Sequence, residues 1–125
     1  MTLLESLCKY IQSAPGIPAG GVFILEDDDK KNVSILLTPT QGYREPEVPV
    51  YHQSFQVLTR SKAYPDAESI AWRAYERVES YQPTDADEKP KAFPDMVQQP
   101  TYLGIDDKKR CVFSFNFTIP TIRKQ

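Results

Sequence analysis

The strongest structural signal in this chain is a regular alternation of residue types near its C-terminus. Between Val112 and Ile119, large apolar residues occupy every second position, and Val, Ser, Asn and Thr occupy the others. A period of two is that of a β-strand with one buried face. Thr101–Ile105 is a shorter strand candidate upstream, and the polar residues 106–109 form a connection of hairpin length. The end of the chain therefore predicts a β-hairpin.

The N-terminal half predicts a helix followed by short strands. Thr2 is a candidate N-cap with Glu5 at the capping-box position, and apolar residues follow at helical spacing until Pro15 and Gly16. The apolar runs 22–25 and 33–37 flank a polar connection, which predicts a second hairpin. Residues 51–60 alternate in polarity and predict a further strand.

A second helix is predicted after Pro65, a residue favoured in the first helical turn. Small and apolar residues follow with spacings of three and four, which is typical of a helix packed closely on a sheet; they are Ala67, Ile70, Ala71, Ala74 and Val78. We therefore expect an α+β fold, in which an N-terminal helix and a central helix cover one face of a mostly antiparallel sheet of hairpins.

The length of the chain is typical of one domain, which we expect to span residues 1–125. Proline-rich and polar stretches predict mobile loops at about 38–50 and 82–99 and a flexible tail at 120–125. The chain has 15 basic and 17 acidic residues and a net charge of -2, which argues against a dedicated nucleic-acid-binding domain without excluding brief contact with DNA. No apolar run approaches the length of a membrane span, and the N-terminus lacks the pattern of a signal peptide.

The sequence offers little for catalysis or metal binding. His52 is the only histidine, Cys8 and Cys111 are too far apart for a zinc or redox motif, and the acidic run 26–29 lacks the spacing and glycine of a calcium loop. No phosphate-binding glycine motif and no nucleophile motif is present. We expect no enzyme activity, no metal and no cofactor.

Several residues are candidates for contacts with a partner. Tyr and Arg are enriched at interface hot spots, and both occur in the long proline-containing segment 38–50. The alternative is that this segment is only a solvated connector. Trp72 lies off the apolar stripe of its helix, as either a partner contact or an aromatic residue at the edge of the core. We expect the flexible tail, which is basic, to become ordered only when it binds a partner, or not at all. The candidate interface residues are Tyr43, Arg44, Glu45, Val48, Trp72, Arg110, Arg123 and Lys124.

Three segments in fixed order resemble a known family. They are Phe55–Tyr64 followed by a helix, the stretch Pro-Thr-Tyr-Leu-Gly-Ile-Asp-Asp-Lys-Lys-Arg at 100–110, and Phe-Ser-Phe-Asn-Phe at 113–117. This order is similar to that of the small tail-terminator or tail-completion proteins of long-tailed bacteriophages, often called minor capsid proteins, and it covers residues 33–119. Lys109 departs from the pattern, because the family often has glycine there, and this puts the type of turn in question.

The resemblance implies a structural role in the virion. Subunits are expected to form a homo-oligomeric ring, a hexamer, that caps the tail tube at the head-tail junction after assembly in the host cytoplasm. The implied partners are the tail-tube protein, the head-tail connector or head-completion protein, and DNA that passes through the lumen without sequence-specific binding; no membrane is involved. Two alternatives are a head-completion adaptor of the DNA channel and a small binding module or enzyme that uses His52.

Overall fold

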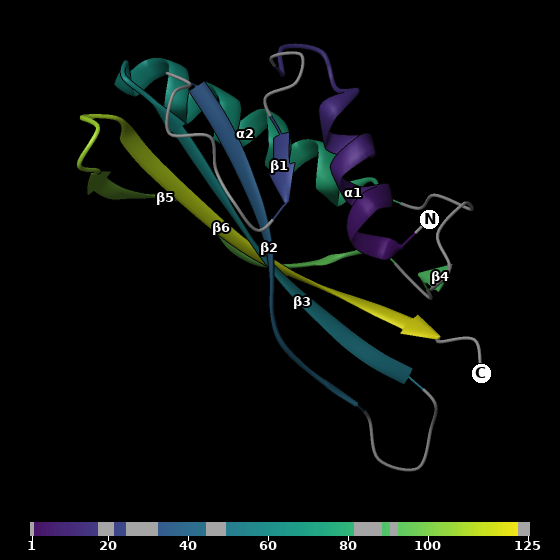
Figure 1. The fold of residues 1–125 in the computed structure, drawn as a ribbon. Helices are drawn as coiled ribbons and strands as arrows, with labels where there is room; N and C mark the ends of the chain where they lie inside the picture. Colours follow the sequence, from purple (N-terminus) through teal and green to yellow (C-terminus); the bar gives the residue numbers. More distant parts are fainter. Residues whose placement is uncertain are drawn as a thin grey trace.

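The computed structural model describes residues 2–17, 22–24, 33–44, 50–81, 89–90 and 93–122 (Figure 1). Two helices lie on one face of a mainly antiparallel sheet, which confirms the predicted α+β class. The elements in chain order are α1 (Leu3–Gln12), β1 (Val22–Ile24), β2 (Val33–Arg44), β3 (Val50–Ser61), α2 (Tyr64–Glu79), β4 (Lys89–Pro90), β5 (Asp95–Ile105) and β6 (Cys111–Ile122).

The sheet has the order β1-β2-β3-β6-β4, and β5 also pairs with β6. Strand β6 pairs along its whole length with β3, from Ile122 opposite Val50 to Cys111 opposite Ser61. On its other edge, β6 pairs with β4 near its end and with β5 along the rest. The predicted C-terminal hairpin is thus confirmed as the antiparallel pair β5 and β6, and β4 and β5 share one edge of the sheet.

The core lies between the helices and the helix-facing side of β3 and β6. Phe113, Phe115 and Phe117 are buried there, as their alternation predicts. The rings of Phe55 and Phe117 stack across the two strands at 5.3 Å, and Tyr75 of α2 meets Phe115 edge-on at 5.5 Å. These contacts fix the position of α2 over β6.

Both helices form where local sequence predicts them. The backbone N–H of Glu5 donates to Oγ1 of Thr2 at 3.1 Å and the N–H of Thr2 donates to Oε1 of Glu5 at 3.3 Å, which completes the capping box of α1. In α2, the stripe of small and apolar residues from Ala67 to Val78 is buried against the sheet. The Oγ1 hydroxyl of Thr59 donates to the carbonyl of Ala67 at 3.3 Å, a close approach that the alanines permit.

The prediction of a hairpin at 22–37 is wrong, because β1 pairs with β2 in parallel. Val22 lies opposite Ile35 and Ile24 lies opposite Leu37. A short apolar run forms an edge strand in either direction, so the pattern of residues did not contain the direction of pairing. The hairpin partner of β2 is β3 instead, through a long antiparallel register from Val33 opposite Ser61 to Arg44 opposite Tyr51.

The predicted loops and tail are shorter than expected. Residues 38–44 belong to β2, and among the described residues Pro39 lies where β2 pairs with a strand on one side only, a sheet-edge position in which proline is tolerated. Residues 95–99 belong to β5, a strand on the sheet edge with an irregular register around Pro100. Residues 120–122 continue β6 because β3 and β4 pair with them. The rest of the predicted loops and tail, at 45–49, 82–88, 91–92 and 123–125, lies outside the described residues.

Candidate interaction surfaces

The outer half of β2, Pro39–Arg44, extends the sheet beyond the reach of β1. Strand β1 pairs only with Ile35–Leu37, so within the described residues the outer edge of β2 is open from Thr38 onward. All six residues of the outer half are exposed, and Figure 1 shows this part of β2 running away from the helices beside β3. We call Pro39–Arg44 together with its partners Tyr51 and His52 the arm.

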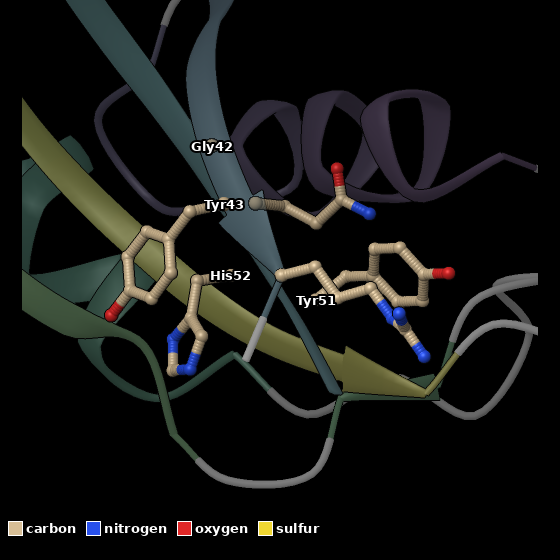
Figure 2. A pocket seen from close by; sticks show the side chains of 6 residues that line it. Gly42, Tyr43, Tyr51 and His52 are labelled. Carbon is tan, nitrogen blue, oxygen red and sulfur yellow. The ribbon is translucent and has the colours of Figure 1, made fainter. Parts of the chain in front are cut away.

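The arm is organised by a β-bulge and two ring contacts. The register shifts between Thr40 and Tyr43, so Gln41 and Gly42 form the bulge. The rings of Tyr43 and His52 stack at 4.4 Å and 11°, and on the other face the guanidinium of Arg44 lies 5.7 Å from the centre of the Tyr51 ring (Figure 2). A Cβ atom at Gly42 would overlap the carbonyl oxygen of His52, so this bulge requires glycine.

The arm encloses a shallow hollow of about 270 Å³ between its two strands (Figure 2). The described lining residues are Gly42, Tyr43, Arg44, Tyr51, His52 and Gln53, none of which is a carboxylate or a thiol. The stack with Tyr43 gives His52 a structural role in holding the arm.

A second surface lies where α2 meets the edge strand β5. Tyr64, Trp72 and Tyr102 are 44%, 37% and 42% exposed, and we call these three residues the aromatic flank. Tyr64 meets the rings of Tyr102 and Phe113 edge-on, each at 5.2 Å. Each flank residue thus anchors one side of its ring in the protein and leaves the other in solvent.

Trp72 fits both interpretations drawn from the sequence. Its ring meets Tyr75 edge-on at 5.4 Å, and Tyr75 in turn packs on Phe115, so Trp72 borders the core. More than a third of the residue is nevertheless exposed. Its neighbours on the outer surface of α2 include the exposed carboxylates of Glu68 and Glu76. An aromatic ring of this kind, anchored but exposed, is typical of an interface residue.

Arg110 acts within its own subunit. It is 3% exposed, and its Nε donates to Oδ2 of Asp106 at 2.9 Å. Oδ1 of Asp106 accepts the N–H groups of Lys108 and Arg110, and Nε of Arg60 lies 3.6 Å from Oδ2. Burial raises the pKa of Asp106, but the hydrogen bonds and charge of Arg110 outweigh it and hold the pKa below its usual value. Arg110 therefore closes the β5–β6 turn rather than standing exposed.

The structure describes three of the remaining predicted contact residues and leaves four outside the described residues. Tyr43 and Arg44 are exposed and come together with Tyr51 and His52 in the arm, and Trp72 lies on the aromatic flank. Glu45, Val48, Arg123 and Lys124 lie outside the described residues. Tyr64 and Tyr102 were missed by sequence reasoning. The predicted hairpin contained a signal for Tyr102. Tyr102 lies directly opposite Phe113 in the register, so its ring is on the same side of the sheet as the ring of Phe113.

The described part of the chain shows no group of three or more histidine, cysteine or acidic residues placed to hold a metal ion. Burial raises the pKa of the Cys8 thiol, and Cys111 is buried. Within the same residues, neither helix has the length and apolar character needed to cross a bilayer.

The sequence of this chain matches a known protein family. No curated protein matches the chain. Residues 8–121 match the family described as bacteriophage tail terminator protein; they include the second half of α1, all of α2, the arm and all of the C-terminal hairpin except Ile122. The match covers far more than half of the 125 residues. The chain therefore belongs to the bacteriophage tail terminator family.

Proposed function

We propose that this protein forms a closed ring on the finished tail tube, stops the addition of tube subunits and presents its free side to the head connector. The family match over residues 8–121 carries this proposal, because it assigns a tail terminator role. We propose six copies in the ring, as the sequence resemblance implies. Occupying the end of the tube removes the surface on which the next tube subunit would bind, so the mechanism needs no catalytic step.

The two exposed surfaces support a ring because they differ in composition and lie toward opposite edges of the sheet. The arm belongs to the β2 side of the strand order, and the aromatic flank belongs to the β5 side. A contact between two different patches is heterologous, and repeated contacts of this kind close into a ring when the rotation between neighbours fits. We propose that the arm of one subunit contacts the aromatic flank of the next.

The sheet edges favour contacts through side chains over the addition of one regular strand to another. On the arm, Pro39 lacks an N–H and the bulge at Gln41–Gly42 distorts the edge. On the other side, β5 contains Pro100 and shifts its register three times against β6. Such edges resist uncontrolled strand pairing. The exposed rings of Tyr43 and Trp72 remain available as anchors.

The proposal is tested first in the phage. Phage that lack this protein are complemented with the wild-type chain, and tail length and head attachment are measured by electron microscopy. We expect overlong tails that do not join heads without complementation, and normal particles with it. Tails of normal length that join heads in the absence of the protein would exclude the terminator function for this chain.

The proposed contact is tested with single substitutions. Tyr43→Ala and Trp72→Ala each remove a central anchor, which we expect to weaken ring assembly by about 30-fold, equivalent to about 2 kcal/mol. Lys9→Ala changes an exposed residue of α1 and serves as the control. Assembly is measured by sedimentation across a concentration series. If both variants assembled like the Lys9 variant, the arm and the aromatic flank would not form the ring contact.

A further inference from the structure

The sheet face opposite the helices carries short polar side chains. Directly opposed residues share a face, so the register of β3, β5 and β6 places one contiguous set of hydroxyls and amides on the side away from α1 and α2. We call the partly exposed members of this set the open face: Ser54, Gln56, Gln98, Asn116 and Thr118. Ser114 lies on the same side of β6 but is buried. Figure 1 shows both helices on the other side of the sheet.

The polar groups of the open face bind one another. Nδ2 of Asn116 donates to Oε1 of Gln98 across β5 and β6. The hydroxyls of Ser54 and Thr118 lie 3.3 Å apart across β3 and β6. These bonds hold neutral donors and acceptors in place over three strands, so the five residues of the open face form a fixed, uncharged, hydrogen-bonding layer.

Charge is sparse on this face, although the chain carries 32 charged side chains other than histidine, 15 basic and 17 acidic. Arg60, opposite Val112 in the register, lies on this side of β3, and its guanidinium is 3.6 Å from the carboxylate of Asp106, which Arg110 also binds. Asp95, an exposed carboxylate, lies at the β5 edge opposite Thr118. The outer surface of α2 contrasts with this face, because it exposes the carboxylates of Asp66, Glu68, Glu76 and Glu79.

We propose that the open face lines the lumen of the ring and is the surface along which duplex DNA slides. This inference rests on the proposed function, in which the two sheet edges meet neighbouring subunits, so that one sheet face points inward and the other outward. DNA carries a dense row of phosphates, so lysines and arginines would hold it in place and carboxylates would oppose its entry. A neutral layer of hydroxyls and amides does neither.

The composition of the open face does not fit a protein partner as well as it fits DNA. The buried centres of protein interfaces are enriched in aromatic residues, methionine and arginine. Among the described residues, four exposed aromatic side chains lie instead on the arm (Tyr43) or the aromatic flank (Tyr64, Trp72 and Tyr102), and a fifth, Phe93, precedes β5. The polar groups of the open face can contact phosphates through bridging water molecules. Such contacts suit DNA that slides past the surface.

Proximity to DNA is tested with a pair of serine-to-cysteine variants. Ser54→Cys lies on the open face, and Ser69→Cys is the matched control on the exposed side of α2. Each cysteine carries a tethered iron chelate that cleaves nearby DNA, and phage built with these chains are triggered to eject their DNA. Wild-type phage treated with the same reagent give the background from Cys8. We expect DNA cleavage above this background from the Ser54 variant alone. Cleavage from the Ser69 variant alone, or from neither, would overturn the assignment of the face.

A charge variant gives an independent readout. Gln56→Lys places one lysine per subunit on the open face, and Ser69→Lys places it on α2. We expect the Gln56 variant to slow DNA ejection at low salt and to recover as salt rises, with a log–log slope of about 0.9 per phosphate contact. Equal ejection rates for both variants would contradict the inference. Tail length and head joining are measured on the same particles: normal values with no DNA effect reject the lumen assignment alone, whereas normal tails in phage that lack the protein reject the proposed function.

Discussion

At the scale of single residues, Lys109 shows how the chain departs from its family pattern without losing the hairpin. Its φ of 62° lies in the left-handed region, and its N–H donates to the carbonyl of Asp106 at 3.0 Å. Glycine adopts this conformation without the contact that a Cβ atom makes. The lysine therefore tolerates the glycine-type turn at a cost in stability.

We predict that Lys109→Gly stabilises the protein by about 1 kcal/mol, because it removes the strain of the left-handed conformation. Urea denaturation of the monomer measures the change. Lys108→Gly is the control, because Lys108 does not have a positive φ, and it should give no gain. Equal effects of the two substitutions would show that the backbone conformation at residue 109 carries no strain.

Asp106 predicts a specific loss of stability in acid. Its pKa is lowered in the folded state, so its contribution is fully present above the ordinary aspartate pKa of about 3.9 and is lost as pH falls through the folded value. We expect Asp106→Asn to lose about 1–3 kcal/mol at pH 7, because a carboxylate that accepts several hydrogen bonds beside buried Arg110 is removed.

The measurement is the free energy of unfolding from pH 7 to pH 2 for the wild type, Asp106→Asn and the exposed control Asp107→Asn. The difference between wild type and the Asp106 variant should shrink as pH falls below about 4. The Asp107 variant should follow the wild type. A difference that stays constant over the whole range would mean that the charge of Asp106 does not stabilise the turn.

At the scale of elements, the arm depends on the bulge at Gly42. We predict that Gly42→Ala weakens the pairing of Tyr43 with His52, because the added Cβ would overlap the carbonyl of His52. The cost should be about 1–3 kcal/mol, confined to the arm. Gln41→Ala, on the other residue of the bulge, is the control. The NMR shifts of the His52 ring protons measure the stack, and unchanged shifts in the Gly42 variant would refute this role.

At the scale of the whole molecule, two different contact surfaces make a prediction about mixtures. A Tyr43→Ala subunit keeps its aromatic flank, and a Trp72→Ala subunit keeps its arm. If the contact is heterologous, the intact arm of a Trp72→Ala subunit binds the intact aromatic flank of a Tyr43→Ala subunit. The two surfaces that remain free on this pair are both mutated, so a mixture gives pairs and no rings. Native mass spectrometry with one variant isotope-labelled identifies the species. Rings in the mixture, or pairs of one variant alone, would show that the contact does not join these two patches.

Local sequence was sufficient for those features that depend on neighbours along the chain. The alternation of Phe113, Phe115 and Phe117 predicted a strand with one buried face, and Thr2 with Glu5 predicted the start of α1. The spacing of the alanines predicted the buried side of α2. In each case the period of burial or the capping geometry is set within a few residues, so the pattern itself carries the information.

Tertiary structure alone decided what depends on distant segments. The parallel pairing of β1, the extension of β2 through Arg44 and the stack of Tyr43 on His52 all require a partner strand that the local pattern does not name. Arg110, a candidate contact in the sequence, is buried because the turn brings Asp106 to its guanidinium. The sequence by itself determined which faces are apolar and to which family the chain is similar. The fold decided which residues meet, because strand direction, register and the closing of turns follow from long-range contacts that balance one another only in the assembled sheet.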